Sequence, residues 1–204
     1  MEELENMRSL HQKQLEREVE GILRGEDLLR PVTMFDPELG IGSSEALKVE
    51  LEYAYNIAAR YKRPYSIAIF NIDGYEEYDA HYGRRAAKLA HKLTAEHIRH
   101  SCRSVDRIYR YDAGTTILLI LPETNYEGGC VLAERVVAGF SRRNIPNFRS
   151  AQHGLLTLSG SVASYEPEKP GKYARWGDMI DDALLHLHLA QGQGGNMIGK
   201  PLPA

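Results

Sequence analysis

The sequence predicts an α/β protein in which helices cover a mixed sheet. Three observations support this fold class. Short apolar runs of strand length recur along the chain, such as S-I-A-I-F-N-I (66–72) and I-L-L-I-L (117–121). Longer segments with apolar residues at helical spacing alternate with these runs. Two strand patterns also follow one another directly, separated by D-A-G (112–114), which indicates a hairpin in the middle of the fold. The expected order is αβαββαβαβ.

The first element, residues 1–31, is expected to be an N-terminal helix. Residues 2 to about 30 are rich in Glu, Gln, Arg and Leu, and Leu15, Val19 and Ile22 fall on one face. The apolar stripe is thin and the opposite face is polar, so this helix needs a partner surface. Two interpretations stay open: the helix packs on its own domain, or it serves dimerisation or signalling. Pro31 ends it, and residues 32–200 are expected to form the domain.

The elements of the domain follow from the same patterns. D-P-E-L-G-I-G-S (36–43) is a turn punctuated by Pro and Gly, and either Ser43 or Ser44 can cap the next helix. Pro64 precedes the strand 66–72, after which one long helix is expected over about 75–100. The remaining elements are the hairpin, a helix over about 124–142, a strand at L-L-T-L-S-G-S-V-A-S, a helix over about 175–190 and a short edge strand at N-M-I-G.

The composition is that of a soluble globular protein, with 43% hydrophobic and 26% charged residues. The net charge of -3 gives no reason to expect nucleic-acid binding. No apolar run approaches the ~20 residues that a membrane span needs. The start, M-E-E-L-E-N-M, lacks the apolar region of a secretory signal. With two cysteines, Cys102 and Cys130, free thiols in a cytoplasmic protein are expected rather than a disulfide.

Four motifs occur in order across the domain. They are D-P-E-L-G-I from Asp36, N-I-D-G-Y-E-E-Y-D-A-H-Y-G from Asn71, R-Y-D-A-G-T-T-I-L-L-I-L-P-E-T from Arg110, and N-M-I from Asn196. In these motifs the chain resembles the GGDEF domain of diguanylate cyclases. The corresponding family patterns are D-x-L-T-G-L, D-x-D-x-F-K-x-x-N-D-x-x-G, R-Y-G-G-D/E-E-F with a trailing L-P-x-T, and G-R-N-x-V. The resemblance extends from Asp36 to about Gly199.

The resemblance implies both a fold and a chemistry. The fold is a central, mainly antiparallel sheet of about five strands flanked by helices, related to the palm of nucleotidyl cyclases. The enzymes of this family join two molecules of GTP into cyclic di-GMP. Such a phosphoryl transfer requires divalent metal to offset the charge of the triphosphate and to activate the attacking 3'-hydroxyl.

The metal-binding positions of the family are changed in this chain. The signature loop G-G-D/E-E-F is here Asp112-Ala113-Gly114-Thr115-Thr116, which differs at every position. The family holds its metal with an Asp at the end of the first strand and with the acid of this loop, which correspond to Asn71 and Gly114. A neutral amide is a poor Mg²⁺ ligand and Gly supplies only backbone, so Asp73 alone keeps a carboxylate nearby. Neither Mg²⁺ nor another cofactor is expected.

The nucleotide-binding positions are changed as well. The Asn and Asp with which the family reads guanine correspond to Asp79 and Lys88. Lys88 offers donors where guanine N1–H and N2–H₂ need acceptors, and each buried polar group left unpaired costs ~1–3 kcal/mol. The late Lys and Arg of the family, which would meet the triphosphate, correspond to Gln191 and Gly195. Because metal, base and phosphate contacts are all affected, the sequence predicts that cyclase activity is lost.

One regulatory motif of the family is kept. Many cyclases carry an inhibitory site, R-x-x-D, shortly before the signature loop, and it binds the product cyclic di-GMP. The segment 103–106 matches it with Arg103 and Asp106. A guanidinium can donate to guanine O6 and N7, and a carboxylate can accept from N1–H and N2–H₂. Arg110 and Arg107 are expected to add positive charge, although strand alternation directs them to different sides. A surface ion pair is the alternative interpretation of the motif.

Three hypotheses about function remain. In the first, the domain is a catalytically inactive receptor that binds cyclic di-GMP through R-x-x-D and passes the signal to a protein partner or a second subunit. In the second, it is a scaffold that binds no nucleotide and dimerises through residues 2–30. In the third, it is a residual cyclase in which Asp73, Asp79 or Asp112 replaces a missing ligand. GTP binding without turnover is a variant of the third, which Lys88 and Asp112 disfavour.

Overall fold

In the computed structural model of the chain, residues 33–150, 153–169 and 171–201 are described. The N-terminal helix expected over residues 1–31 lies outside this part. In the described part, no helix is both long enough and apolar enough to cross a membrane.

One sheet forms the centre of the domain. Its strands follow the order β1-β2-β4-β5-β3-β6-β7, and neighbours are antiparallel except for the parallel pairs β2–β4 and β6–β7. The strands are β1 (Phe35–Asp36), β2 (Ile41–Gly42), β3 (Tyr65–Ile72), β4 (Arg107–Arg110), β5 (Ile117–Pro122), β6 (Leu158–Tyr165) and β7 (Ile198–Gly199). The mainly antiparallel sheet is confirmed. The described residues form seven strands rather than about five. The two additional strands are β1 and β2, which are very short and pair with each other across the turn that begins at Asp36.

Five helices in the described residues cover the sheet. They are α2 (Ser44–Tyr61), α3 (Tyr75–Tyr82), α4 (Arg84–Ser101), α5 (Tyr126–Ser141) and α6 (Trp176–Gly192). Ser43 rather than Ser44 caps α2, since its hydroxyl accepts a hydrogen bond of 3.1 Å from the amide of Ala46. The single helix expected over about 75–100 is wrong. Gly83 interrupts it with a φ of 83°, a conformation that glycine adopts without strain.

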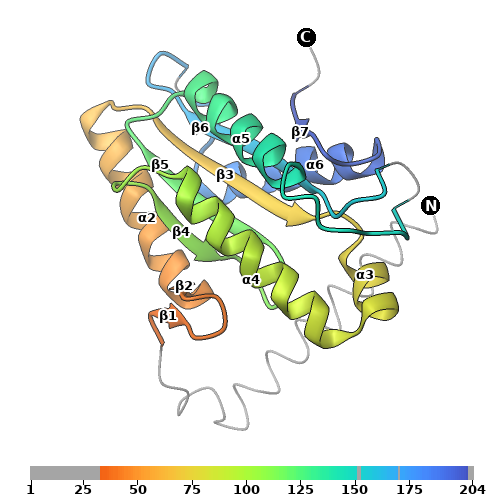
Figure 1. The fold of residues 1–204 in the computed structure, drawn as a ribbon. Helices are drawn as coiled ribbons and strands as arrows, with labels where there is room; N and C mark the ends of the chain where they lie inside the picture. Colours follow the sequence, from red (N-terminus) through yellow and green to blue (C-terminus); the bar gives the residue numbers. More distant parts are fainter. Residues whose placement is uncertain (1–32, 151–152, 170, 202–204) are drawn as a thin grey trace, which may run out of the picture. The chain divides into compact units, whose positions relative to one another are not determined.

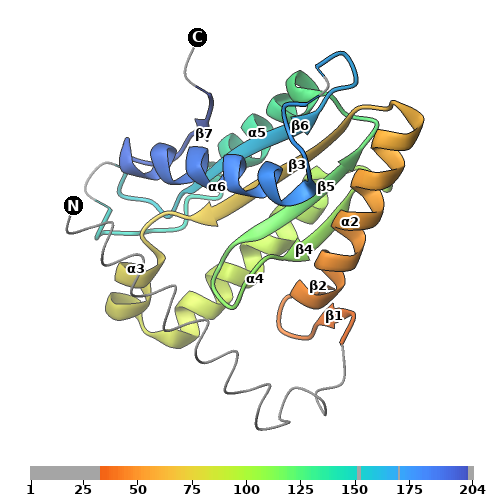
Figure 2. The ribbon, with the colours of Figure 1, turned by 180° about the vertical axis from the view of Figure 1, so that it is seen from behind.

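The helices lie on both faces of the sheet, which gives three layers (Figures 1 and 2). In Figure 1, α4 and α5 lie in front of the strands, and in Figure 2, α2 and α6 do. The core divides accordingly. Alternate residues of β3 face different helices: Ala68 and Phe70 pack with α4 and α5, whereas Ile67 and Ile69 pack with α2 and α6. Both sides of the central strands are therefore buried, which explains their continuous apolar runs.

The register of the central strands determines what meets at one end of the sheet. Phe70 of β3 pairs with Ile117 of β5. The connection between β4 and β5 is closed by a hydrogen bond of 2.9 Å from the amide of Tyr111 to the carbonyl of Thr116. Asn71, the next residue of β3, consequently lies beside the start of β5. The segment 112–116 and the end of β3 are thus neighbours.

Candidate functional site

An open cavity of about 790 Å³ lies where β3 ends, beside the β4–β5 connection, α3 and the start of α4. Figure 2 shows this end of the sheet, with α3 and the start of α4 near the β4–β5 connection. The structure brings most of the substituted positions together here. Those that line the cavity are Asn71, Asp79, Lys88, Asp112, Ala113, Gly114, Thr115, Thr116 and Gln191. Asp73 and Gly195 line a different cavity.

Asn71 is held in a neutral hydrogen-bonded cluster at the cavity wall. Its Oδ1 accepts a hydrogen bond of 3.0 Å from the hydroxyl of Thr115, and its Nδ2 donates one of 3.0 Å to the hydroxyl of Thr116. This cluster does not fit Mg²⁺, because proteins usually hold Mg²⁺ through one or two carboxylates and the cluster offers none. In the part of the chain that the structure describes, no three His, Cys, Asp or Glu side chains converge as a metal site.

Asp73, expected to keep a carboxylate near the metal position, is turned toward another part of the fold. Its Oδ2 accepts hydrogen bonds from the hydroxyl of Thr157 (2.7 Å) and from the amide of Asn196 (2.9 Å). A Cβ atom at Gly195 would lie 2.7 Å from this carboxylate, so the segment before β7 packs closely on it. Asp73 therefore anchors the segment that leads into β7, and it does not line the cavity at the end of β3.

The two residues expected at the guanine-reading positions, Asp79 and Lys88, are engaged in ion pairs. Asp79 accepts a hydrogen bond of 3.1 Å from Arg84, which follows the break between α3 and α4. Lys88 of α4 lies 3.1 Å from Glu38, whose side chain comes from the β1–β2 turn. The hydrogen bond from Lys88 outweighs partial burial and, with the charges of Lys88 and Arg110, lowers the pKa of Glu38. Sequence analysis did not identify Glu38 as part of the site.

Arg110 connects the signature-loop position to the β1–β2 turn. Its guanidinium donates to three carbonyls of the loop, those of Asp112 (2.9 Å), Ala113 (3.0 Å) and Gly114 (3.1 Å). It also donates to Oδ2 of Asp36 at 2.8 Å. Burial alone would raise the pKa of Asp36, but Arg110 and two backbone amides hold it below its usual value. These bonds direct Arg110 away from the start of β4, so the structure does not bring it together with Arg103 and Asp106.

His91 is a second residue of the cavity that sequence analysis did not identify. It lies on α4 with only 3% of its surface exposed, lines the cavity and packs edge-on against Tyr75. Within the described part of the chain its Nε2 has no hydrogen-bond partner. Burial, together with the charge of Arg110, lowers the pKa of His91 to about 4, so the ring is neutral near pH 7. The sequence did contain a signal for its burial: His91 lies four residues after Ala87 and four before Ala95, on the apolar face of α4.

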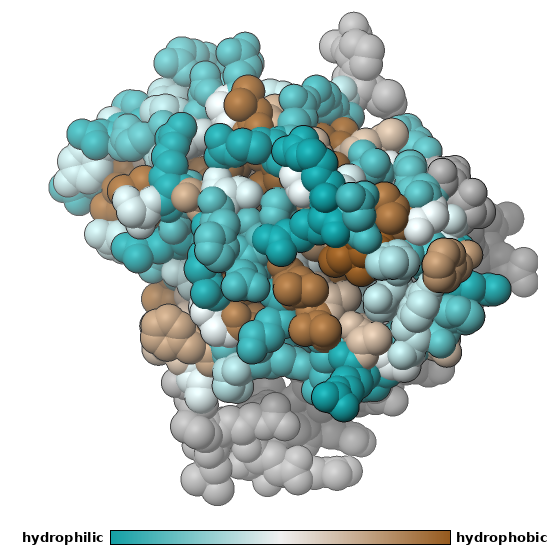
Figure 3. Space-filling view, viewed as in Figure 1, coloured by the Kyte–Doolittle hydropathy of each residue, from teal (hydrophilic) through white to brown (hydrophobic). Residues whose placement is uncertain are grey.

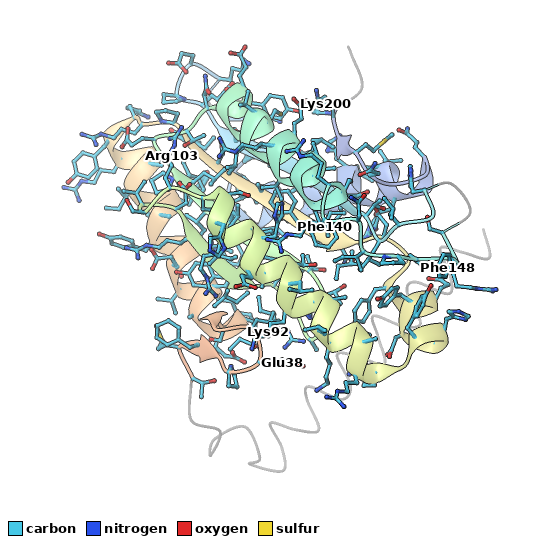
Figure 4. The ribbon with its side chains drawn as sticks, in the orientation of Figure 1. Glu38, Lys92, Arg103, Phe140, Phe148 and Lys200 are labelled. Atoms are coloured by element: carbon cyan, nitrogen blue, oxygen red, sulfur yellow. The ribbon has the colours of Figure 1, made fainter. Side chains whose placement is uncertain are left out.

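The R-x-x-D segment forms an exposed turn before β4. Oδ2 of Asp106 accepts a hydrogen bond of 2.7 Å from the amide of Arg103, and the amide of Asp106 donates to the carbonyl of Arg103 at 3.1 Å. Residues 103–105 are exposed, whereas Asp106 is half-buried. Figure 4 shows Arg103 at the periphery, well apart from Glu38 beside the cavity. The turn and the cavity thus lie at opposite ends of β4.

Comparison with known protein families identifies the family to which this chain belongs. The family model described as diguanylate cyclase, GGDEF domain, matches residues 33–194. The chain belongs to the GGDEF family.

Individual relatives are distant from this GGDEF domain. Diguanylate cyclase DgcP of Pseudomonas aeruginosa is 25% identical over 143 residues, which make up 70% of this chain and 21% of DgcP. The chain thus spans about a fifth of the length of this curated relative.

Two solved structures share the fold. The GGDEF domain of DgcB from Caulobacter crescentus, in complex with cyclic di-GMP, is 17% identical with a TM-score of 0.72, over 84% of this chain and 94% of that one. Diguanylate cyclase SiaD from Pseudomonas aeruginosa, in complex with its activator SiaC, is 19% identical with a TM-score of 0.69, over 95% and 72%.

Proposed function

We propose that this GGDEF domain is a receptor for cyclic di-GMP that binds the ligand at the turn 103–106 and does not itself join GTP molecules. The observation that carries the proposal is the exposed turn, in which the Arg103 side chain lies at the surface and Asp106 orders the backbone. The complex of the DgcB GGDEF domain with cyclic di-GMP supports this ligand class, because that domain has the same fold.

The chemistry of the turn suits a guanine base. An exposed guanidinium presents a planar fork of donors, which matches guanine O6 and N7. The carboxylate of Asp106 has about four acceptor sites. One of them is used by the amide of Arg103, so acceptor capacity remains for guanine N1–H and N2–H₂. The hydrogen bond that closes the turn is therefore compatible with binding of a guanine base.

Titration calorimetry with cyclic di-GMP tests the receptor role. The wild-type protein is expected to release heat on binding, and Arg103→Ala is expected to bind at least about tenfold more weakly, because a charge-assisted, forked contact is lost. Asp106→Asn is expected to keep the turn, since an amide oxygen can still accept from the Arg103 amide, and yet to bind more weakly. Arg85→Ala makes the same change of charge at an exposed position of α4 and should leave the affinity unchanged. Absence of heat with the wild-type protein would rule out the receptor role.

The chemistry of the cavity supports the proposed loss of cyclase activity. Asn71 and the two threonines form a neutral cluster where the family places metal ligands. Asp79 and Lys88 are paired with Arg84 and Glu38. Without carboxylates in this cluster, the wall lacks the metal ligands through which the family offsets the charge of a triphosphate during phosphoryl transfer.

Incubation with GTP and Mg²⁺ or Mn²⁺ tests this part of the proposal. No cyclic di-GMP is expected by chromatography under conditions in which an active diguanylate cyclase converts GTP readily. Formation of product, abolished by Asp112→Ala or Asp79→Ala, would instead establish a residual enzyme.

A further inference from the structure

The outer surface of α2 carries a row of apolar and aromatic side chains. Val49, Tyr53, Ile57 and Tyr61 are spaced by four residues and are 69%, 63%, 36% and 58% exposed. Side chains four apart are neighbours along one helix face. The opposite face of α2, with Leu47, Leu51 and Ala58, is buried in the core, so this row is not needed for packing within the domain.

Four neighbouring exposed side chains make this a row rather than a single exposed apolar residue. The face that bears α4 and α5 is mainly hydrophilic, with scattered apolar residues (Figure 3). Single exposed apolar residues are ordinary in soluble proteins, whereas a continuous row is typical of an interaction surface. In Figure 2, α2 forms one edge of the described domain, with its outer side free of the other labelled elements.

A second row runs beside the first. Lys48, Glu52, Asn56 and Arg60 are also spaced by four residues and are all exposed. From Glu52 to Arg60 this row is negative, then neutral, then positive, and on reversal about Asn56, Lys48 falls opposite residue 64, beyond the end of α2. Such a row is complementary to itself when it is reversed, because reversal places Glu52 opposite Arg60 and Asn56 opposite Asn56.

We propose that two copies of this chain associate through an antiparallel pairing of their α2 helices. Around a two-fold axis near residues 55 and 56, Val49 faces Tyr61 of the partner subunit, and Tyr53 faces the partner's Ile57. Each small apolar side chain thus opposes a large aromatic one. The same axis brings Glu52 beside Arg60 of the partner subunit. A parallel pairing would instead place like charges together, so the charge pattern selects the antiparallel orientation.

The size of the surface sets the strength of this contact. The row from Val49 to Tyr61 spans about 18 Å of helix. A single pair of helices of this length buries less area than the roughly 1,200 Å² of a stable interface. We therefore expect a weak, reversible dimer that forms between micromolar and millimolar concentrations. This inference is independent of the receptor role and uses a different surface.

Sedimentation velocity of the full chain across this concentration range tests the proposal. Glu52→Arg and Arg60→Glu are each expected to weaken association about tenfold, because every reversal replaces two symmetry-related attractions by repulsions. The double variant is expected to restore the wild-type dissociation constant. Within one copy these residues are eight positions apart and about 12 Å distant along the helix, so restoration requires contact between copies.

An apolar substitution provides a second readout. Ile57→Asp is expected to leave only monomer over the same range, whereas Leu185→Asp, at a residue of α6 that is 56% exposed, should dimerise as the wild type does. Circular dichroism would verify that each variant is folded. A wild-type chain that is monomeric throughout, or a dimer insensitive to the α2 variants, would overturn the proposal.

Discussion

Replacement of Arg110 by methionine is expected to lower the free energy of unfolding by about 3 kcal/mol. The guanidinium makes four hydrogen bonds, three to the 112–114 backbone and one to Asp36. The side chains of Arg110 and Asp36 are only 19% and 11% exposed, so water does not readily replace the lost partner. The variant therefore leaves a largely buried carboxylate without this donor. The three loop carbonyls lose it too, but residues 112–114 are exposed, so water can replace the guanidinium there. Urea unfolding monitored by circular dichroism measures the loss.

Two further variants make the expected result for Arg110 specific. Arg107→Met changes the same kind of residue at an exposed position of β4 and should alter stability by no more than about 0.5 kcal/mol. Arg110→Lys should recover only a minor part of the loss, because an ammonium group cannot donate to all of these acceptors at once. If lysine restored full stability, a positive charge alone would be sufficient, and the forked geometry would not be the cause.

Acidification is expected to destabilise the domain through His91. The pKa of the buried ring is lowered from 6.5 to about 4. As the pH falls below 6.5, the unfolded chain takes up a proton that the folded chain does not, so stability is lost progressively until the folded pKa is reached. Above pH 6.5 this contribution is complete, and below about pH 4 no more is lost. A shift of this size corresponds to about 3 kcal/mol between the two limits.

Comparison with His91→Leu isolates this effect from other titrating groups. The pKa of His97 is also lowered, mainly by burial, so the wild-type profile contains more than one contribution. The difference in unfolding free energy between wild type and His91→Leu should change by about 3 kcal/mol from pH 7 to pH 4. His188→Leu, at an exposed position of α6, should follow the wild-type profile. If the unfolding free energies of the wild type and His91→Leu changed equally with pH, the folded protein would bind a proton at His91 as readily as the unfolded chain does, and the pKa would not be lowered.

The fold was predictable where the chain carries strong local signals. The central strands β3, β5 and β6 are buried on both faces, and in β3 and β5 this produces mainly apolar runs of strand length. The strands β1 and β2 contain two residues each and arise from a turn, so they leave no periodic pattern. The break at Gly83 was missed because one glycine is tolerated within a helical pattern, and only its backbone angle reveals the interruption.

The candidate site was predictable in its positions but not in its contacts. The ordered motifs singled out the substituted residues, and most of these residues line one cavity in the structure. The orientation of Asp73 depends on Thr157 and Asn196, which are 84 and 123 residues away in the sequence. The role of Arg110 depends likewise on Asp36, 74 residues away. Side-chain directions set by such distant partners leave no trace in local spacing.

The uncharged cluster of Asn71, Thr115 and Thr116 has a consequence for the ionic conditions that the domain tolerates. Two acids placed at this wall would repel each other whenever no cation was bound, and the local structure would then respond to chelators and to magnesium supply. An amide bridged by two hydroxyl groups has no such dependence. This end of the sheet can therefore stay ordered through changes in divalent ion concentration.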